Sequence, residues 1–134
     1  MGKIAQDSIL LDAGSITEYI KKILRQAGVR EDVSCHVSEG LVQASLRGID
    51  SHGIRLLPHY LKGVEGGRIN PKPNYKFEKT STSSGKLDGD HTFGHAAGVE
   101  GMNKAIETAA EAGTGHVAVY NSSHFGAAAF FALL

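Results

Sequence analysis

The chain has 134 residues, of which 41% are hydrophobic and 21% are charged, a composition typical of one soluble globular domain. Its 14 basic residues balance its 14 acidic residues, so no net positive charge favours nucleic acid or an anionic membrane surface. Its single cysteine cannot form an internal disulfide, and no apolar run reaches the length of a membrane span. We therefore expect a cytoplasmic protein, with neither nucleic acid nor a membrane among its partners.

Three helices are predicted in the first half of the chain, each followed by glycine. Residues 15–18 (Ser-Ile-Thr-Glu) have the pattern of a capping box, and the helix that they begin is predicted to stop at Gly28. A second helix is predicted over residues 31–46. The apolar periodicity of residues 56–64 predicts a third helix, which the glycines at 66–67 terminate. The predicted buried face of the second helix consists of Val33, Val37, Leu41, Ala44 and Ser45.

Strands and a helix alternate in the second half of the chain. Residues 75–79 and 86–89 are predicted to form a strand and a short returning strand, and residues 116–120 a buried strand. A helix is predicted from about residue 94 to residue 112. This order is typical of an α/β protein with a mixed sheet. The predicted packing face of the helix consists of Val99, Met102, Ile106 and Ala109.

These elements divide the chain into an N-terminal helical region, residues 1–70, and the beginning of an α/β domain, residues 71–134. Prolines at 71 and 73 interrupt any helix between the two regions. Residues 126–134 are almost wholly apolar, favour a helix and contain no stop signal. We therefore expect the fold to be truncated within this last element.

The first polar segment with chemical potential is residues 47–55, Arg-Gly-Ile-Asp-Ser-His-Gly-Ile-Arg. An imidazole such as that of His52 titrates near neutral pH and can exchange a proton with a carbinol oxygen. An arginine guanidinium matches the geometry of a carboxylate. The alternative is structural: Asp50 or Ser51 caps the next helix, and His52 merely lies in its first turn.

A second polar segment, residues 121–126 (Asn-Ser-Ser-His-Phe-Gly), directly follows the last predicted strand. Ligands of α/β proteins gather at the carboxyl ends of strands, although a capping turn with a solvated His124 is the alternative. Residues 89–95 contain two histidines but no complete set of metal ligands, so no metal site is predicted. No GxGxxG follows a strand, so no Rossmann dinucleotide site is predicted either.

Several landmarks occur in a characteristic order: Leu46-Arg47-Gly48-Ile49-Asp50-Ser51-His52-Gly53, Tyr60, Gly67, Asn70, Asp88-Gly89, Ala105-Ile106 and Asn121-Ser122-Ser123-His124-Phe125-Gly126. In this order they resemble the type 2 malate/L-lactate dehydrogenase family, and the two longest motifs make the resemblance specific. It spans nearly the whole chain. It implies the non-Rossmann α/β fold of sulfolactate dehydrogenases, NAD or NADP as cofactor, and a homodimer in the full-length protein.

The resemblance also implies roles for individual residues. His52 matches the proton-transfer histidine of the family, and Ser51 matches the neighbouring hydroxyl at the substrate. His124 matches a second histidine that faces substrate and nicotinamide, so Ser123 and His124 are the implied cofactor-binding residues.

The residue that binds the substrate carboxylate is less directly implied. Some family members carry an arginine four residues after the first histidine, where this chain has Leu56. Arg55 stands one residue earlier, and Arg47 competes with it for the role.

The resemblance predicts the N-terminal part of an NAD(P)-dependent oxidoreductase that interconverts 2-oxo and 2-hydroxy acids of the malate, lactate or sulfolactate type. Family members are much longer, so this chain is expected to carry half a site and to be inactive alone. The alternative is a non-catalytic fragment that acts as a binding or dimerisation module. Neither the acid nor the choice between NAD and NADP follows from these residues.

Overall fold

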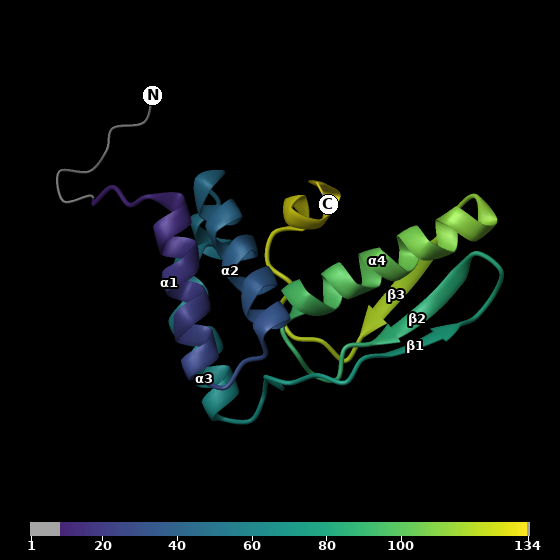
Figure 1. The fold of residues 1–134 in the computed structure, drawn as a ribbon, viewed down its shortest axis with the longest axis horizontal. Helices are drawn as coiled ribbons and strands as arrows, with labels where there is room; N and C mark the ends of the chain where they lie inside the picture. Colours follow the sequence, from purple (N-terminus) through teal and green to yellow (C-terminus); the bar gives the residue numbers. More distant parts are fainter. Residues whose placement is uncertain (1–8, 134) are drawn as a thin grey trace.

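The structure, a computed structural model, describes residues 9–133 as an α/β fold (Figure 1). Three helices pack together on one side of the molecule, and the fourth packs on a three-stranded sheet. The helices are α1 (Ala13–Gln26), α2 (Glu31–Leu46), α3 (Leu57–Glu65) and α4 (Gly94–Ala112). The strands are β1 (Lys76–Lys79), β2 (Ser84–Asp88) and β3 (His116–Tyr120), and the short 3-10 segments are η1 (Asp50–His52), η2 (Ile54–Leu56) and η3 (Ala128–Leu133). No helix in the described part of the chain is long and apolar enough to cross a membrane.

The start of α1 differs from the prediction, which placed a capping box at residues 15–18. Asp12 occupies the N-cap position, and its carboxylate accepts a hydrogen bond from the N–H of Ser15 at 2.7 Å. Aspartate serves here because its oxygen satisfies a free amide and its charge complements the helix dipole. The predicted stop is confirmed: α1 ends at Gln26, and Gly28 follows with a left-handed φ of 85°.

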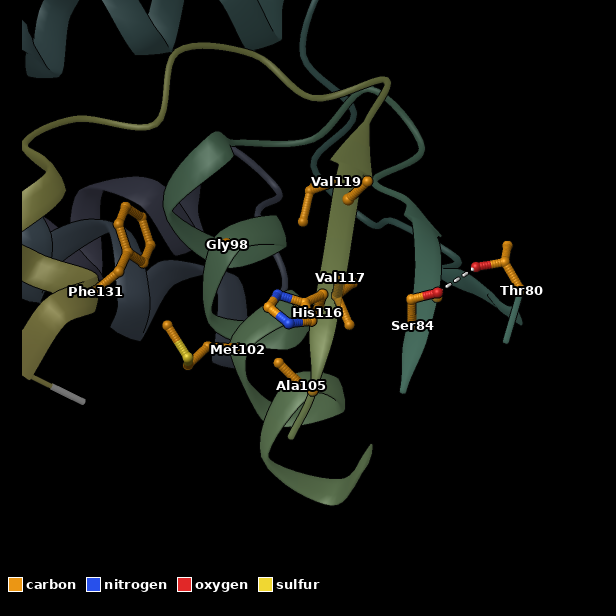
Figure 2. Close-up of a pocket in the computed structure, with 13 residues that line it drawn as sticks. Thr80, Ser84, Gly98, Met102, Ala105, His116, Val117, Val119 and Phe131 are labelled. Carbon is orange, nitrogen blue, oxygen red and sulfur yellow. Dashed lines mark hydrogen bonds between the residues drawn. The ribbon is translucent and has the colours of Figure 1, made fainter. Parts of the chain in front are cut away.

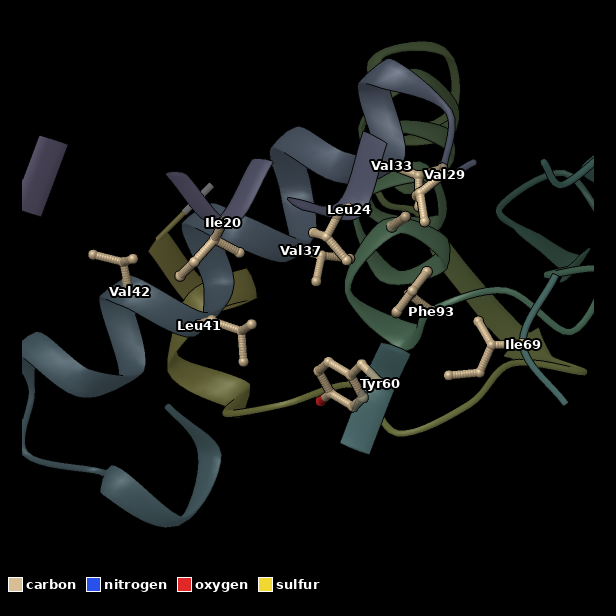
Figure 3. Close-up of a cluster of buried hydrophobic side chains, with 11 residues drawn as sticks. Ile20, Leu24, Val29, Val33, Val37, Leu41, Val42, Tyr60, Ile69 and Phe93 are labelled. Atoms are coloured by element: carbon tan, nitrogen blue, oxygen red, sulfur yellow. The ribbon is translucent and has the colours of Figure 1, made fainter. Parts of the chain in front are cut away.

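The hydrophobic core lies where α1, α2 and α3 meet the beginning of α4 (Figure 3). The predicted bounds of α2 are confirmed, and its predicted face is buried except for Ser45, which is half-buried. Burying one large aliphatic side chain contributes about 1.5–3 kcal/mol. Because the core contains residues from both halves of the sequence, it fixes α4 against the helical region. Its members are Ile20, Leu24, Val29, Val33, Val37, Leu41, Val42, Tyr60, Ile69, Phe93 and Ala96.

The sheet is mixed, as predicted. β1 pairs antiparallel with β2, with Lys76 opposite Asp88, and β2 pairs parallel with β3, with Ser84 opposite His116. The prediction that residues 116–120 form a buried strand is wrong. Side chains of β3 alternate between exposed and half-buried, because β3 pairs with β2 alone in the described chain while α4 covers one face.

The predicted span of α4 is confirmed, but its predicted packing face is only partly right. Val99 is buried, whereas Ile106 is 55% exposed because the C-terminal half of α4 extends beyond the core. The apolar segment at residues 126–134 forms the 3-10 segment η3 within its described part. There Phe130 and Phe131 are half-buried, and η3 contacts α2 and α4.

Candidate active site

Two histidines from distant parts of the sequence meet between the helical region and the sheet. His52 lies at the end of η1, in the corner between α2 and α3, and His124 lies in the loop after β3. Their ring centroids are 5.2 Å apart, with an angle of 34° between the ring planes. The fold therefore brings together the two polar motifs that stand 72 positions apart (124 minus 52) in the sequence.

A hydroxyl group contacts the Nδ1 atom of each ring. Ser51 Oγ lies 2.9 Å from Nδ1 of His52, and the Tyr60 hydroxyl lies 2.8 Å from Nδ1 of His124. No described hydrogen bond involves Nε2 of either ring within residues 9–133. Since the hydroxyls fix which nitrogen is occupied, Nε2 is the atom that each ring offers to a ligand.

The structural alternative for the corner is wrong in one respect. Neither η1 nor the helical turns after it begin with a side-chain cap, and the Ser51 hydroxyl bonds the neighbouring imidazole instead. The corner is held by backbone and side-chain contacts of short range. Ser45 Oγ accepts from the N–H of Ile54 at 3.0 Å, and a Cβ at Gly53 would overlap that hydroxyl. Gly48 supplies the left-handed turn, with φ of 72°.

The loop that carries His124 is held by contacts of longer range. Asp90, His91 and Asn121 all have left-handed backbones, with φ of 50°, 58° and 48°. The N–H of His91 donates to the carbonyl of Asn121 at 2.6 Å, and the N–H of Ser123 donates to the carbonyl of Thr92 at 2.9 Å. Left-handed L-residues are strained and persist where the surroundings over-determine them. This junction fixes the path of the loop after β3.

The environment of His124 favours its uncharged form. Burial lowers the pKa of His124, and the nearby positive forms of His52 and His59 lower it further. Burial raises the pKa of Tyr60 to about 12, so its phenol stays protonated and can donate to a neutral imidazole. Arg68 Nη2 lies 3.4 Å from Nε2 of His59, and its positive charge favours an anionic ligand in this part of the molecule.

The two candidate arginines differ in their contacts. The Arg47 guanidinium bonds back along α2, to the side chain of Gln43 at 2.6 Å and to its carbonyl at 3.2 Å. Arg55 is exposed on η2, three residues after His52, and takes part in no described hydrogen bond within residues 9–133. The structure thus groups Ser51, His52 and His124, and it directs Arg47 elsewhere.

Sequence reasoning missed two contributors. Tyr60 is a landmark of the family resemblance but has no predicted role in the site, yet its hydroxyl bonds His124. A buried tyrosine hydroxyl usually has a hydrogen-bond partner, and this is the signal that could have found it. His95 is fully buried beside Tyr60.

The Ser123 hydroxyl is buried without a hydrogen-bond partner in the described chain. The described residues contain no cluster of three or more potential metal ligands.

An open groove of about 720 Å³ lies elsewhere, between α4 and β3 (Figure 2). Glycines on α4 and short side chains on the strand leave this space. Among the described residues that line it, His116 is the one titratable side chain. The groove therefore lacks the paired acid–base groups of the imidazole site.

The geometry agrees with comparisons to known proteins. The malate/L-lactate dehydrogenase family model matches residues 11–134. The chain belongs to this family. The chain is 35% identical to the malate dehydrogenase of Pyrococcus abyssi over 133 residues, which are 99% of this chain and 37% of that protein. It is 38% identical to the L-sulfolactate dehydrogenase of Methanocaldococcus jannaschii over 117 residues, 87% of this chain and 34% of that protein.

Solved structures give the same result for the fold. The malate dehydrogenase of Pyrococcus horikoshii superposes with a TM-score of 0.94 at 32% identity, covering 99% of this chain and 38% of that one. The family fold, predicted from the two polar motifs, is thereby confirmed. The chain spans little more than a third of the length of these relatives.

Proposed function

We propose that this chain supplies the substrate-side imidazole pair of an NAD(P)-dependent dehydrogenase that interconverts 2-oxo and 2-hydroxy acids. The observation that carries the proposal is the His52–His124 pair, with ring centroids 5.2 Å apart and a hydroxyl on each Nδ1. Relatives named malate and sulfolactate dehydrogenase support the substrate class.

His52 is proposed as the proton donor and acceptor. In its charged form the ring donates from Nδ1 to the Ser51 hydroxyl at 2.9 Å and from Nε2 to the substrate's carbonyl oxygen. Giving up the Nε2 proton completes the hydroxyl of the 2-hydroxy acid and leaves a neutral ring. In the oxidative direction the neutral ring takes that proton back.

Arg55 is proposed to bind the substrate carboxylate. Arg55 lies three residues after His52 and its side chain is exposed. Its guanidinium has no hydrogen-bond partner among residues 9–133, whereas the guanidinium of Arg47 donates to Gln43. A guanidinium fork can form two parallel hydrogen bonds to a carboxylate. The positive charge of Arg68, which lies 3.4 Å from His59, adds attraction for an anion.

The residues present fit the nicotinamide end of the cofactor. The buried Ser123 hydroxyl lacks a partner among residues 9–133, and the lowered pKa of the neighbouring His124 favours an uncharged ring. Ser123 and His124 would hold that end. When bound, a reduced nicotinamide supplies the hydride for the carbonyl carbon. His124 would orient the reacting groups, since Tyr60 fixes its ring.

The proposal is tested with the protein as its gene encodes it. Oxaloacetate, pyruvate and sulfopyruvate are each offered with NADH and with NADPH, and loss of nicotinamide absorbance is followed. Turnover of at least one acid is expected, and it should be lost in His52→Ala but kept in His36→Ala, a matched histidine on α2. A folded protein that turns over none of the acids contradicts the proposal and favours a binding or dimerisation module.

A further inference from the structure

A third histidine, His95, lies next to Tyr60, the residue whose hydroxyl contacts His124. It is in the first turn of α4, its side chain is 0% exposed, and neither ring nitrogen has a hydrogen-bond partner in the described chain. A buried polar group usually has such a partner, so this ring requires an explanation other than its own hydrogen bonds. Its packing supplies one.

The His95 imidazole occupies a slot between two glycines from separate elements. A Cβ at Gly40, on α2, would overlap Cδ2 of the ring, and a Cβ at Gly126 would overlap the adjacent Nε2. Gly126 follows His124 by two residues and has a left-handed φ of 78°. The flat ring therefore fills the space between α2 and the backbone that leads away from His124.

The same ring contacts the tyrosine that bonds His124. Its centroid lies 5.8 Å from that of Tyr60, in an edge-on arrangement of 75°, and 6.2 Å from that of Phe130. Edge-on packing of this kind is favourable and fixes the orientation of both rings. A shift of His95 would be passed to Tyr60, and from Tyr60 to the 2.8 Å contact with His124.

We propose that His95 is a positioning residue, whose ring, held between Gly40 and Gly126, sets the Tyr60 hydroxyl and the loop backbone that carries His124. Its own charge stays out of the chemistry. Burial lowers the pKa of His95 to about 4, and the nearby His124 and His52 lower it further. A neutral ring leaves the proton of the site to His52, whereas a charged one would oppose protonation there.

Gly40→Ala tests the proposal without altering any of the imidazoles or Tyr60. The added methyl group meets the His95 ring, which is fully buried and packs closely against Gly126 as well, so the ring has to shift to make room. The control is Gly14→Ala on α1, where a Cβ would meet only Oδ2 of the N-cap residue Asp12, at 3.3 Å, and no imidazole within 4 Å. The double variant Gly40→Ala/His95→Ala removes the overlap, so its effect should be less than the product of the two single effects.

Two measurements are made on the full chain. One is the titration of the histidine ring signals by NMR, which does not depend on the proposed function. The other is the measurement of kcat and KM for the 2-oxo acid, and this measurement depends on the proposed function. In Gly40→Ala we expect the His124 pKa to rise toward its ordinary value, and kcat to fall about tenfold to a hundredfold with little change in KM, as for a misplaced reacting group.

The outcomes separate the two proposals. If Gly40→Ala and His95→Ala lower only the melting temperature, while the His124 titration matches that of Gly14→Ala, His95 is a packing residue and the inference is overturned. If no variant turns over any acid but the His124 titration shifts as expected, the positioning role stands and the proposed function fails.

Discussion

The two imidazoles of the site reach the same place on loops that are held in different ways. The corner that carries His52 is closed by neighbours in sequence: the N–H of Ile49 donates to Ala44, and that of Ile54 to the Ser45 hydroxyl, nine residues away. The loop that carries His124 has no comparable local frame. Its ring is held by Tyr60, 64 residues away in the sequence.

The left-handed positions show the same contrast. The corner uses Gly48, where the space around the missing Cβ is open. The junction beneath the His124 loop uses Asp90, His91 and Asn121, each strained by about 1–3 kcal/mol. Strain of this size is maintained only if several contacts fix the backbone together. We infer that the corner is set by local geometry and the loop by its tertiary contacts.

The largest expected effect comes from the corner. His52→Ala should lower kcat by about a hundredfold or more, because a positioned general acid is lost, and should change KM for the 2-oxo acid far less. Steady-state kinetics of the full-length protein measures both. The matched control is His36→Ala on α2. A near-normal kcat for His52→Ala across neutral pH would leave that histidine with a structural role alone.

A pair of glycine substitutions tests the difference between the two loops directly. Gly48→Ala should cost about 1–2 kcal/mol, the penalty of a left-handed L-residue in open space. Gly126→Ala carries the same penalty and also overlaps His95, which adds about 1–3 kcal/mol of overpacking. Urea unfolding of both variants gives the comparison. Equal losses would show that the His124 loop is no more constrained than the corner.

The buried His95 predicts how stability depends on pH. Its pKa is about 4 when folded and 6.5 in the unfolded reference, so between these values the unfolded chain binds a proton that the folded chain does not. The free energy of unfolding therefore falls as pH drops from 6.5 to 4, by about 1.4 kcal/mol per unit at most, or about 2 kcal/mol at pH 5.

Unfolding in urea at several pH values measures this slope. In His95→Gln the slope should flatten between pH 6.5 and 4, whatever the absolute stability of the variant. His36→Gln should keep it. A slope unchanged by His95→Gln would mean that other groups cause the acid sensitivity.

The features that could be predicted from the sequence are those that depend on residues close together in the chain. The bounds of α2, the span of α4 and the strand β3 follow from periodicity and terminal glycines, and the polar motifs around His52 and His124 were visible at once. The exposure of Ile106 was not predictable, because it depends on how far α4 extends beyond the core. The helical pattern of α4 alone does not contain that information.

The parts of the site that sequence reasoning missed depend on distant contacts. Tyr60 has the spacing of a core residue, and only the fold places its hydroxyl on His124. In the sequence, His95 belongs to a segment with two histidines, whereas its environment is made by glycines 55 residues before it and 31 after it (95 minus 40; 126 minus 95). No local pattern pairs Gly40 with Gly126.

The smallest expected effect tests the long-range contact itself. Tyr60→Phe removes the hydroxyl that bonds Nδ1 of His124 at 2.8 Å but keeps the ring that packs edge-on against Phe93 and His95. Stability should fall by only about 0.5–1.5 kcal/mol, the net value of one hydrogen bond. Because the protonated phenol donates to the neutral imidazole, its loss should raise the pKa of His124. The acid limb of the kcat/KM profile should then move to higher pH, and kcat should fall by up to about tenfold.

Tyr19→Phe, at a 61% exposed position on α1, is the control. If both tyrosine variants give the wild-type pH profile, the His124 loop does not depend on Tyr60, and the contrast between the two loops is wrong.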